Sequence, residues 1–179
     1  MTDQHVISAC LRGDKVGQEQ LYKSFLPYLL TVVRRYGFLP YQEPDCIQEI
    51  FIEVFLSLAN FDASKGAFKT WIRTLAVRKL LNLKRDKNQL QFDELESASG
   101  LSVKQIDFDT YEIEYIMQAI AALPSGFCTV FNLSEIDGYS HKEIGEMLGI
   151  SPASSRSQLS RAKQKLAQQL QLSTYKRAS

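Results

Sequence analysis

Residues 151–170 combine side chains that can hydrogen-bond to DNA with the spacing of an amphipathic helix. One side of the helix would carry small and apolar residues at intervals of four, three, four and four: Ser155, Leu159, Ala162, Leu166 and Leu170. The other side would carry hydroxyl, amide and cationic groups: Ser154, Ser157, Gln158, Arg161, Gln164, Lys165 and Gln168. These groups suit base edges and phosphates in a DNA major groove. The pattern predicts a helix buried on one side and facing DNA on the other.

A second, shorter helix is expected immediately before this one. Ser140 and Glu143 have the spacing of a capping box, in which each side chain accepts a hydrogen bond from the other residue's backbone. Gly149 supplies the positive φ that ends such a helix. Ser151 caps the next helix, and Pro152 fits its first position. The two helices predict a helix-turn-helix that reads DNA; the alternative is a purely structural helical hairpin.

Basic residues concentrate in two blocks, although the net charge is only +1. Residues 65–90 have a net charge of +7 and residues 138–179 of +5, whereas residues 91–137 have −8 and residues 1–64 have −3. Two basic blocks separated by an acidic one favour two surfaces that contact phosphates. The alternative for either block alone is an ordinary solvated face.

The first basic block is expected to form a helix over residues 68–86. Its cationic side chains lie mostly outside the apolar arc, with Lys79 near the edge of that arc and Trp71 within it. Cations beside an aromatic ring, next to the Ser-Lys-Gly loop at 64–66, suit single-stranded or distorted DNA. The alternative is that Trp71 belongs to the hydrophobic core.

A helix over residues 45–60 has an unusual outer face. The core stripe accounts for most of its apolar residues, but Ile52 and Leu56 fall on the opposite side, beside Asp45, Gln48 and Glu49. An apolar patch rimmed by carboxylates predicts a docking site for a basic partner. The alternative is a helix buried on nearly all sides.

The remaining pattern indicates an all-α protein of two small helical domains. Further helices are expected over 5–12, 16–36 with a kink or division at Pro27, 112–122 and 124–136. We expect an N-terminal bundle over 1–90, an acidic linker over 91–111, and a four-helix domain with the helix-turn-helix over 112–179.

Several function classes are excluded on sequence grounds. The two histidines belong to no plausible metal cluster or catalytic triad, and no nucleotide-binding or nucleophile-elbow motif occurs, so we expect no enzymatic activity, cofactor or metal. The three cysteines are far apart and are expected to be reduced, buried thiols. No signal peptide or membrane span is evident, so we expect a cytoplasmic protein with no membrane insertion.

Four segments together resemble a bacterial sigma factor of the extracytoplasmic-function (ECF) group in the sigma-70 family. They are residues 11–29, 45–55, 66–85 and 123–166. The resemblance covers nearly the whole chain. It is specific because helix-turn-helix regulators in general lack the basic segment at 66–85.

The resemblance implies a role for each surface and no catalytic residue. Core RNA polymerase, through its β′ clamp helices, would bind Asp45, Gln48, Glu49, Ile52 and Leu56. The opened −10 promoter element would bind Ser64, Lys65, Gly66, Ala67, Trp71, Arg73, Arg78, Lys79 and Asn82. The −35 element would bind Ser154, Arg156, Ser157, Gln158 and Arg161. The β flap of polymerase and an anti-sigma factor are further partners that the family implies. Gly145 stands where alanine is common in the family and permits a closer helix contact.

Two other functions fit parts of the pattern. A free-standing helix-turn-helix regulator would bind duplex DNA as a dimer without polymerase, but it would not need the face around Ile52 and Leu56. An anti-sigma or adaptor-like helical protein would bind protein only, so neutralising Arg156 and Arg161 would have no effect on it.

Overall fold

The computed structural model describes residues 3–86 and 111–177, which form helices joined by short turns. These residues divide into two compact units. One contains residues 3–34 and 38–86, and the other contains residues 35–37 and 111–177. The predicted all-α fold is confirmed. The predicted acidic linker lies, apart from Tyr111, outside the described residues.

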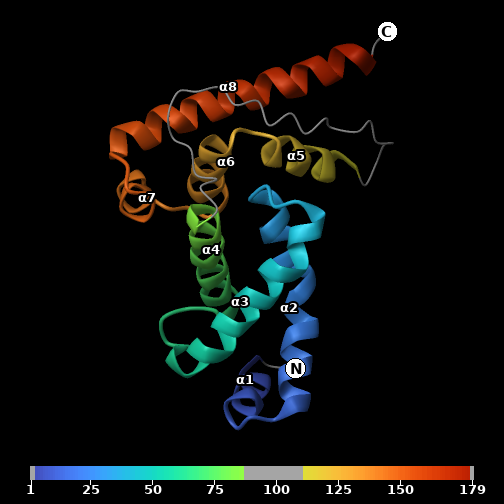
Figure 1. The fold of residues 1–179 in the computed structure, drawn as a ribbon, viewed down its shortest axis with the longest axis vertical. Helices are drawn as coiled ribbons and strands as arrows, with labels where there is room; N and C mark the ends of the chain where they lie inside the picture. Colours follow the sequence, from blue (N-terminus) through green and yellow to red (C-terminus); the bar gives the residue numbers. More distant parts are fainter. Residues whose placement is uncertain (1–2, 87–110, 178–179) are drawn as a thin grey trace. The chain divides into compact units, whose positions relative to one another are not determined.

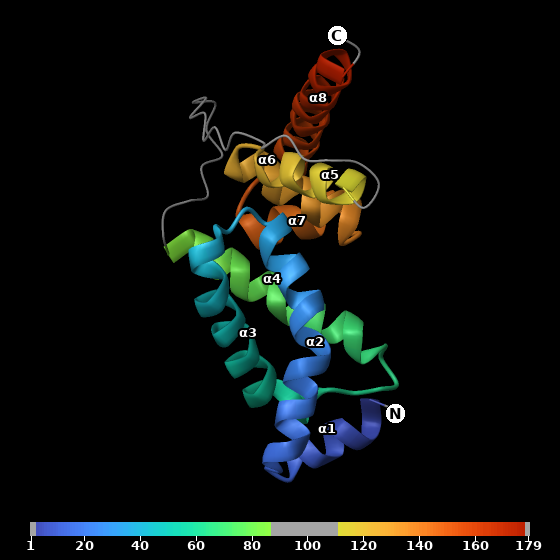
Figure 2. The same ribbon diagram turned by 90° about the vertical axis from the view of Figure 1, so that its right-hand side faces the viewer.

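Four helices make up the N-terminal unit (Figure 2). They are α1 (Asp3–Leu11), α2 (Lys15–Arg35), α3 (Glu43–Ser57) and α4 (Phe68–Asp86), with short 3-10 turns at Pro40–Gln42 and Leu58–Asn60. Pro27 lies inside α2 without dividing it. Its ring is on the exposed side of the helix, and its carbonyl accepts a hydrogen bond from the Thr31 hydroxyl at 3.1 Å.

The core of the N-terminal unit follows the predicted apolar stripe in α3 but only in part in α4, where Leu75 and Leu83, which were expected within the apolar arc, are half-buried. Ile47, Ile50, Phe51 and Val54 of α3 are buried, and α4 packs along α3. The inward face of α4 is also buried, including Ile72 and the following residues Ala76, Val77, Leu80 and Leu81. Burial of these side chains supplies the main driving force for the bundle, because each removes apolar surface from water.

The C-terminal unit contains the four predicted helices. They are α5 (Tyr111–Ala121), α6 (Ser125–Phe131), α7 (His141–Leu148) and α8 (Pro152–Arg177). A π-helical turn, Asn132–Ile136, extends α6. Figure 1 shows α8 lying across the other three helices. The shared core consists of Ala119, Ile120, Leu123, Cys128, Ala162 and Leu166.

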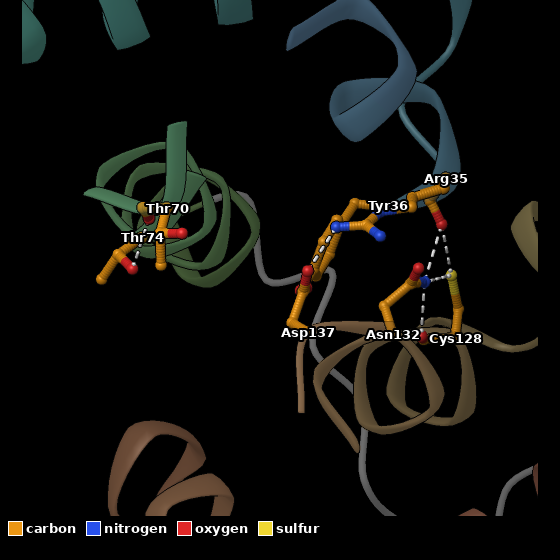
Figure 3. A network of polar contacts seen from close by, with 7 residues as sticks. All are labelled: Arg35, Tyr36, Thr70, Thr74, Cys128, Asn132 and Asp137. Atoms are coloured by element: carbon orange, nitrogen blue, oxygen red, sulfur yellow. Dashed lines mark hydrogen bonds and ion pairs between the residues drawn. The ribbon is translucent and has the colours of Figure 1, made fainter. Parts of the chain in front are cut away.

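A buried polar network lies in the C-terminal unit, which includes the short segment Arg35–Gly37 (Figure 3). Arg35 Nη2 forms an ion pair with Asp137 Oδ1 at 2.5 Å, and the Tyr36 hydroxyl donates to Asp137 Oδ2 at 2.7 Å. Asn132 Nδ2 donates to the Arg35 carbonyl at 2.8 Å. Burial and the nearby Asp137 carboxylate raise the pKa of Tyr36 well above its ordinary value, so its hydroxyl remains a donor at neutral pH.

The cysteine prediction is confirmed, since Cys10, Cys46 and Cys128 are buried and form no disulfide with one another. Within the described residues, no group of histidine, cysteine and acidic side chains could hold a metal ion. Nor does any helix among these residues combine the length and the apolar composition that a membrane span requires.

Candidate nucleic-acid interface

The helix-turn-helix forms as its capping residues predict. Ser140 N donates to Glu143 Oε2 at 2.8 Å, and Glu143 N donates to Ser140 Oγ at 3.3 Å. The Ser140 hydroxyl also donates to Glu143 Oε2, at 2.7 Å, and this bond and the one from the Ser140 N–H lower the pKa of Glu143 because both stabilise its carboxylate. Gly149 adopts φ 70° at the end of α7, and Ser151 Oγ accepts from Ser154 N at 3.0 Å at the start of α8.

The outward face of α8 carries most of the predicted −35 residues. Arg156, Ser157 and Arg161 are exposed, and Ser154 is half-buried. We call these four residues the recognition face. They present two guanidinium groups and two hydroxyls from the first three turns of the helix, a set of donors and acceptors suited to phosphates and base edges.

The prediction that Gln158 belongs to this outward face is wrong. Its side chain is only 6% exposed, and its Oε1 has no hydrogen-bond partner. The reason is helical periodicity: Gln158 follows Ser155 by three residues and precedes Ala162 by four, and both neighbours are fully buried. Gln158 therefore lies at the edge of the buried stripe.

Helix α4 presents a second set of basic side chains, beside an exposed loop. Residues 64–67 of the loop are exposed, as are Arg78 and Asn82, one turn apart on α4. Arg73, Trp71 and Lys79 are half-buried. We call these residues together the α4 basic face.

Two lysines of α4 make contacts with other segments that the sequence did not indicate. Lys79 Nζ lies 2.7 Å from Glu49 Oε2 of α3. This pair joins a residue predicted to bind DNA to one predicted to bind polymerase. Lys84, which was expected outside the apolar arc, is 4% exposed, with its ammonium 5.6 Å from the centre of the Phe38 ring. Neither contact could be read from the spacing within one helix, because each partner comes from another segment.

Trp71 lies at the edge of an aromatic cluster. Its ring stacks on Phe68 with centroids 5.3 Å apart, and it meets Phe61 at 5.5 Å. Phe68 in turn meets Phe61 and Phe25 edge to face. Because Trp71 is only half-buried, it contributes to packing and also keeps part of its ring exposed beside the loop.

The loop before α4 has a defined conformation. Asp62 Oδ1 accepts hydrogen bonds from Ser64 N at 2.9 Å and from Ser64 Oγ at 2.7 Å. These bonds stabilise the carboxylate and lower the pKa of Asp62. Gly66 has φ 152°, a backbone conformation that other residues rarely adopt. The side chain of Lys65 is 83% exposed on this loop, and its ammonium lies 3.6 Å from Asp62 Oδ2.

The outer face of α3 is exposed, so the alternative of an all-round buried helix is wrong. Ile52 is 46% exposed and Leu56 is 77% exposed, one helical turn apart. Asp45 and Gln48 are exposed beside them, and Glu49 is half-buried by its contact with Lys79. We call these five residues the docking face.

Comparison with known proteins finds a matching family model for each of the two units. A family model for sigma-70 region 2 matches residues 21–89, and one for sigma-70 region 4 matches residues 113–166. The chain belongs to the ECF group of the sigma-70 family. It is thus an RNA polymerase sigma factor, a class of protein whose role is non-catalytic and whose partners are core RNA polymerase and promoter DNA.

Relatives of this sigma factor come from several bacterial species. It is 26% identical to the ECF RNA polymerase sigma-E factor of Haemophilus influenzae, over 96% of both chains. It is 24% identical to the sigma-E factor of Escherichia coli, over 96% of this chain and 95% of that one. The match to ECF sigma factor SigE of Mycolicibacterium smegmatis is 29% identical and covers 68% of this chain but only 49% of that protein.

The fold of this sigma factor also has a solved counterpart. The structure of CnrH in complex with the cytosolic domain of CnrY matches 95% of this chain and 97% of that chain, with a TM-score of 0.52 and 20% sequence identity. At this level of identity the likeness concerns the fold alone. The pattern of helices in both units is therefore one that an experimentally determined protein also adopts.

Proposed function

We propose that this sigma factor carries core polymerase to its promoters through the three surfaces defined above. The docking face binds the β′ clamp helices. The observation that carries this assignment is the exposure of Ile52 and Leu56 on an otherwise amphipathic helix. Exposed aliphatic side chains beside carboxylates complement a partner with apolar and basic residues, as protein interfaces commonly do.

The α4 basic face holds the opened −10 element. Arg78, Lys65 and Asn82 supply charge and hydrogen bonds for the backbone, and the exposed part of Trp71 offers a π-face to an unstacked base. Stacking on an aromatic ring is typical of single-strand binding and contributes about 1–3 kcal/mol per base. The defined conformation of the loop supports this assignment, because a fixed loop loses less entropy on binding.

The recognition face lies in the major groove of the −35 element. Arg156 and Arg161 contact phosphates, and Ser154 and Ser157 contact bases. The C-terminal unit also binds the β flap, and an anti-sigma factor controls the protein in the cytoplasm.

Run-off transcription with purified core polymerase on a randomised promoter library tests the proposal. We expect transcripts only when this sigma factor is present, and an enriched pair of sequence elements upstream of the start sites. Tight binding to a palindromic duplex without polymerase, and no transcripts, would instead identify a dimeric regulator. Binding to protein alone would identify the adaptor-like alternative.

Neutralising the cations of the recognition face should weaken promoter binding for all sequences. Arg156→Ala and Arg161→Ala should each reduce the slope of log affinity against log salt by about one. Ser157→Ala should instead change the preferred −35 sequence, because hydroxyl contacts to bases carry sequence information. Equal changes in slope for all three variants would contradict this division of roles.

Because Lys79 forms an ion pair with Glu49, we expect alanine at Arg78 and alanine at Lys79 to affect DNA binding to different extents. Arg78→Ala should reduce binding of a single-stranded −10 oligonucleotide by the holoenzyme about tenfold, equivalent to about 1.4 kcal/mol. Lys79→Ala should reduce it by less, because Glu49 already neutralises the Lys79 ammonium at 2.7 Å. Fluorescence anisotropy with labelled oligonucleotide measures both. A larger loss for Lys79→Ala would show that Lys79 contacts DNA directly.

A further inference from the structure

The start of α8 is held against α7 by two contacts that lie one helical turn apart. His141 and Gly145 are four residues apart and therefore share one face of α7. At Gly145, an added Cβ would lie 2.6 Å from the Ile150 carbonyl oxygen and 3.6 Å from Pro152 N, so the turn and the start of α8 lie directly against the glycine. This is the close contact that glycine at position 145 was expected to permit.

The second contact is polar. His141 Nδ1 lies 2.9 Å from Ser155 Oγ. Ser155 is fully buried, and it lies between Ser154 and Arg156 of the recognition face. A serine hydroxyl can donate to an unprotonated ring nitrogen or accept from a protonated one, so the bond is retained in either tautomer.

Hydrogen bonds of the neighbouring residues fix the position of His141 at the start of α7. It is the first residue of α7, directly after the Ser140 of the capping box. Just before it, Tyr139 N donates to the Leu133 carbonyl at 2.9 Å, which ties this segment to the turn after α6. The histidine therefore connects α8 to a part of the C-terminal unit that has its own hydrogen bonds.

These contacts restrict the rotation of α8 about its own axis. The buried stripe of α8, which includes Leu159, Ala162 and Leu166, packs against α5, α6 and α7 and sets the general orientation of the helix. A hydrogen bond weakens steeply as its angle departs from linear. The hydrogen bond at Ser155 and the close approach at Gly145 therefore add a directional constraint at the start of α8, beside the recognition face.

We propose that His141 is a positioning residue for promoter recognition, which acts through its hydrogen bond to Ser155. The bond fixes the rotation of α8 and so aims the recognition face at the −35 groove. This inference rests on the proposed function of that face. His141 itself does not contact DNA.

The test uses the full chain bound to core polymerase and two duplex probes, one with the −35 sequence selected from the randomised library and one with that sequence scrambled. His141→Leu replaces the imidazole with an apolar side chain of similar volume that lacks Nδ1. Ser155→Ala removes the hydroxyl. Each should weaken binding of the selected duplex about tenfold but change scrambled-duplex binding less than twofold. His141→Asn retains a polar atom near the position of Nδ1 and should stay within twofold of the wild type. Ser134→Ala is the matched hydroxyl deletion elsewhere in the unit and should have no effect.

A double-mutant cycle separates positioning from simple loss of stability. If the two residues act through one bond, the double variant His141→Leu/Ser155→Ala should bind the selected duplex no more weakly than either single variant. Additive losses, wild-type affinity in His141→Leu, or equal losses on both probes would overturn the inference. If Ser155→Ala does not fold, the comparison of the Leu and Asn variants at His141 decides the question alone. Failure of the wild type itself to bind the selected promoter would instead overturn the proposed function.

Discussion

Arginine in place of Leu56 is expected to abolish binding of core polymerase while leaving the helical content and thermal stability unchanged. Leu56 is 77% exposed, so a longer charged side chain there meets no core residue. In the complex, the same guanidinium would be buried against a basic partner surface without a counter-charge. Like charges brought together at an interface cost about 2 kcal/mol or more, so we expect at least about a thirtyfold loss of affinity. Ile52→Arg should behave in the same way.

Surface plasmon resonance with immobilised core polymerase measures this effect, and circular dichroism checks the fold. The matched control is Val16→Arg on α2, because Val16 is 70% exposed and undergoes the same change of chemistry outside the docking face. Val16→Arg should bind with wild-type affinity. Normal binding by both Leu56→Arg and Ile52→Arg would remove the docking face from the proposal.

Asp137→Asn is expected to lower the free energy of unfolding by about 3–5 kcal/mol, the usual cost of removing one partner from a buried ion pair. The pair with Arg35 is largely inaccessible to water, with side-chain exposures of 8% for Arg35 and 0% for Asp137. The substitution keeps the shape of the side chain but leaves the Arg35 guanidinium without a counter-charge. It also weakens the acceptor for the Tyr36 hydroxyl. Urea denaturation followed by circular dichroism measures the loss.

An exposed ion pair two residues earlier provides the control. Glu135 pairs with Lys163 at 2.9 Å, and both side chains remain more than a third exposed. Glu135→Gln should cost less than about 1 kcal/mol, because solvent screens such pairs. Replacing Arg35 by methionine in the Asp137→Asn protein should recover part of the stability, since the uncompensated charge is then gone. Equal costs for Asp137→Asn and Glu135→Gln would show that burial does not set the strength of the Arg35 pair.

Local signals in the sequence were sufficient for the helices and for most of the candidate surfaces. The capping box at Ser140, the positive φ at Gly149 and the serine cap at Ser151 depend on residues within four positions of one another, so their geometry follows from the chain alone. The docking face was also predictable, because two aliphatic residues at i and i+4 on the side opposite the core stripe stand out in any helical wheel.

Gln158 shows that a helical wheel does not predict the burial of every side chain. It lies three residues after Ser155 and four before Ala162, a position on the boundary between the buried and exposed sides. Whether a boundary residue is covered depends on the width of the surface that packs against the helix. Helix α8 packs against α5, α6 and α7, and the side chain is covered. The sequence contains no local signal of that width.

The sequence by itself determined the helical class, the family, the approximate position of each helix and the outward apolar pair Ile52 and Leu56, because these depend on short-range spacing and on motif content. Tertiary structure alone decided which polar groups meet: Arg35 with Asp137, Lys79 with Glu49, and His141 with Ser155. The members of each pair come from different helices or turns, 102, 30 and 14 residues apart in the chain. A hydrogen bond or ion pair forms only when packing brings its two atoms within about 3 Å. Helical periodicity fixes directions around one axis and carries no information about the distance between two axes.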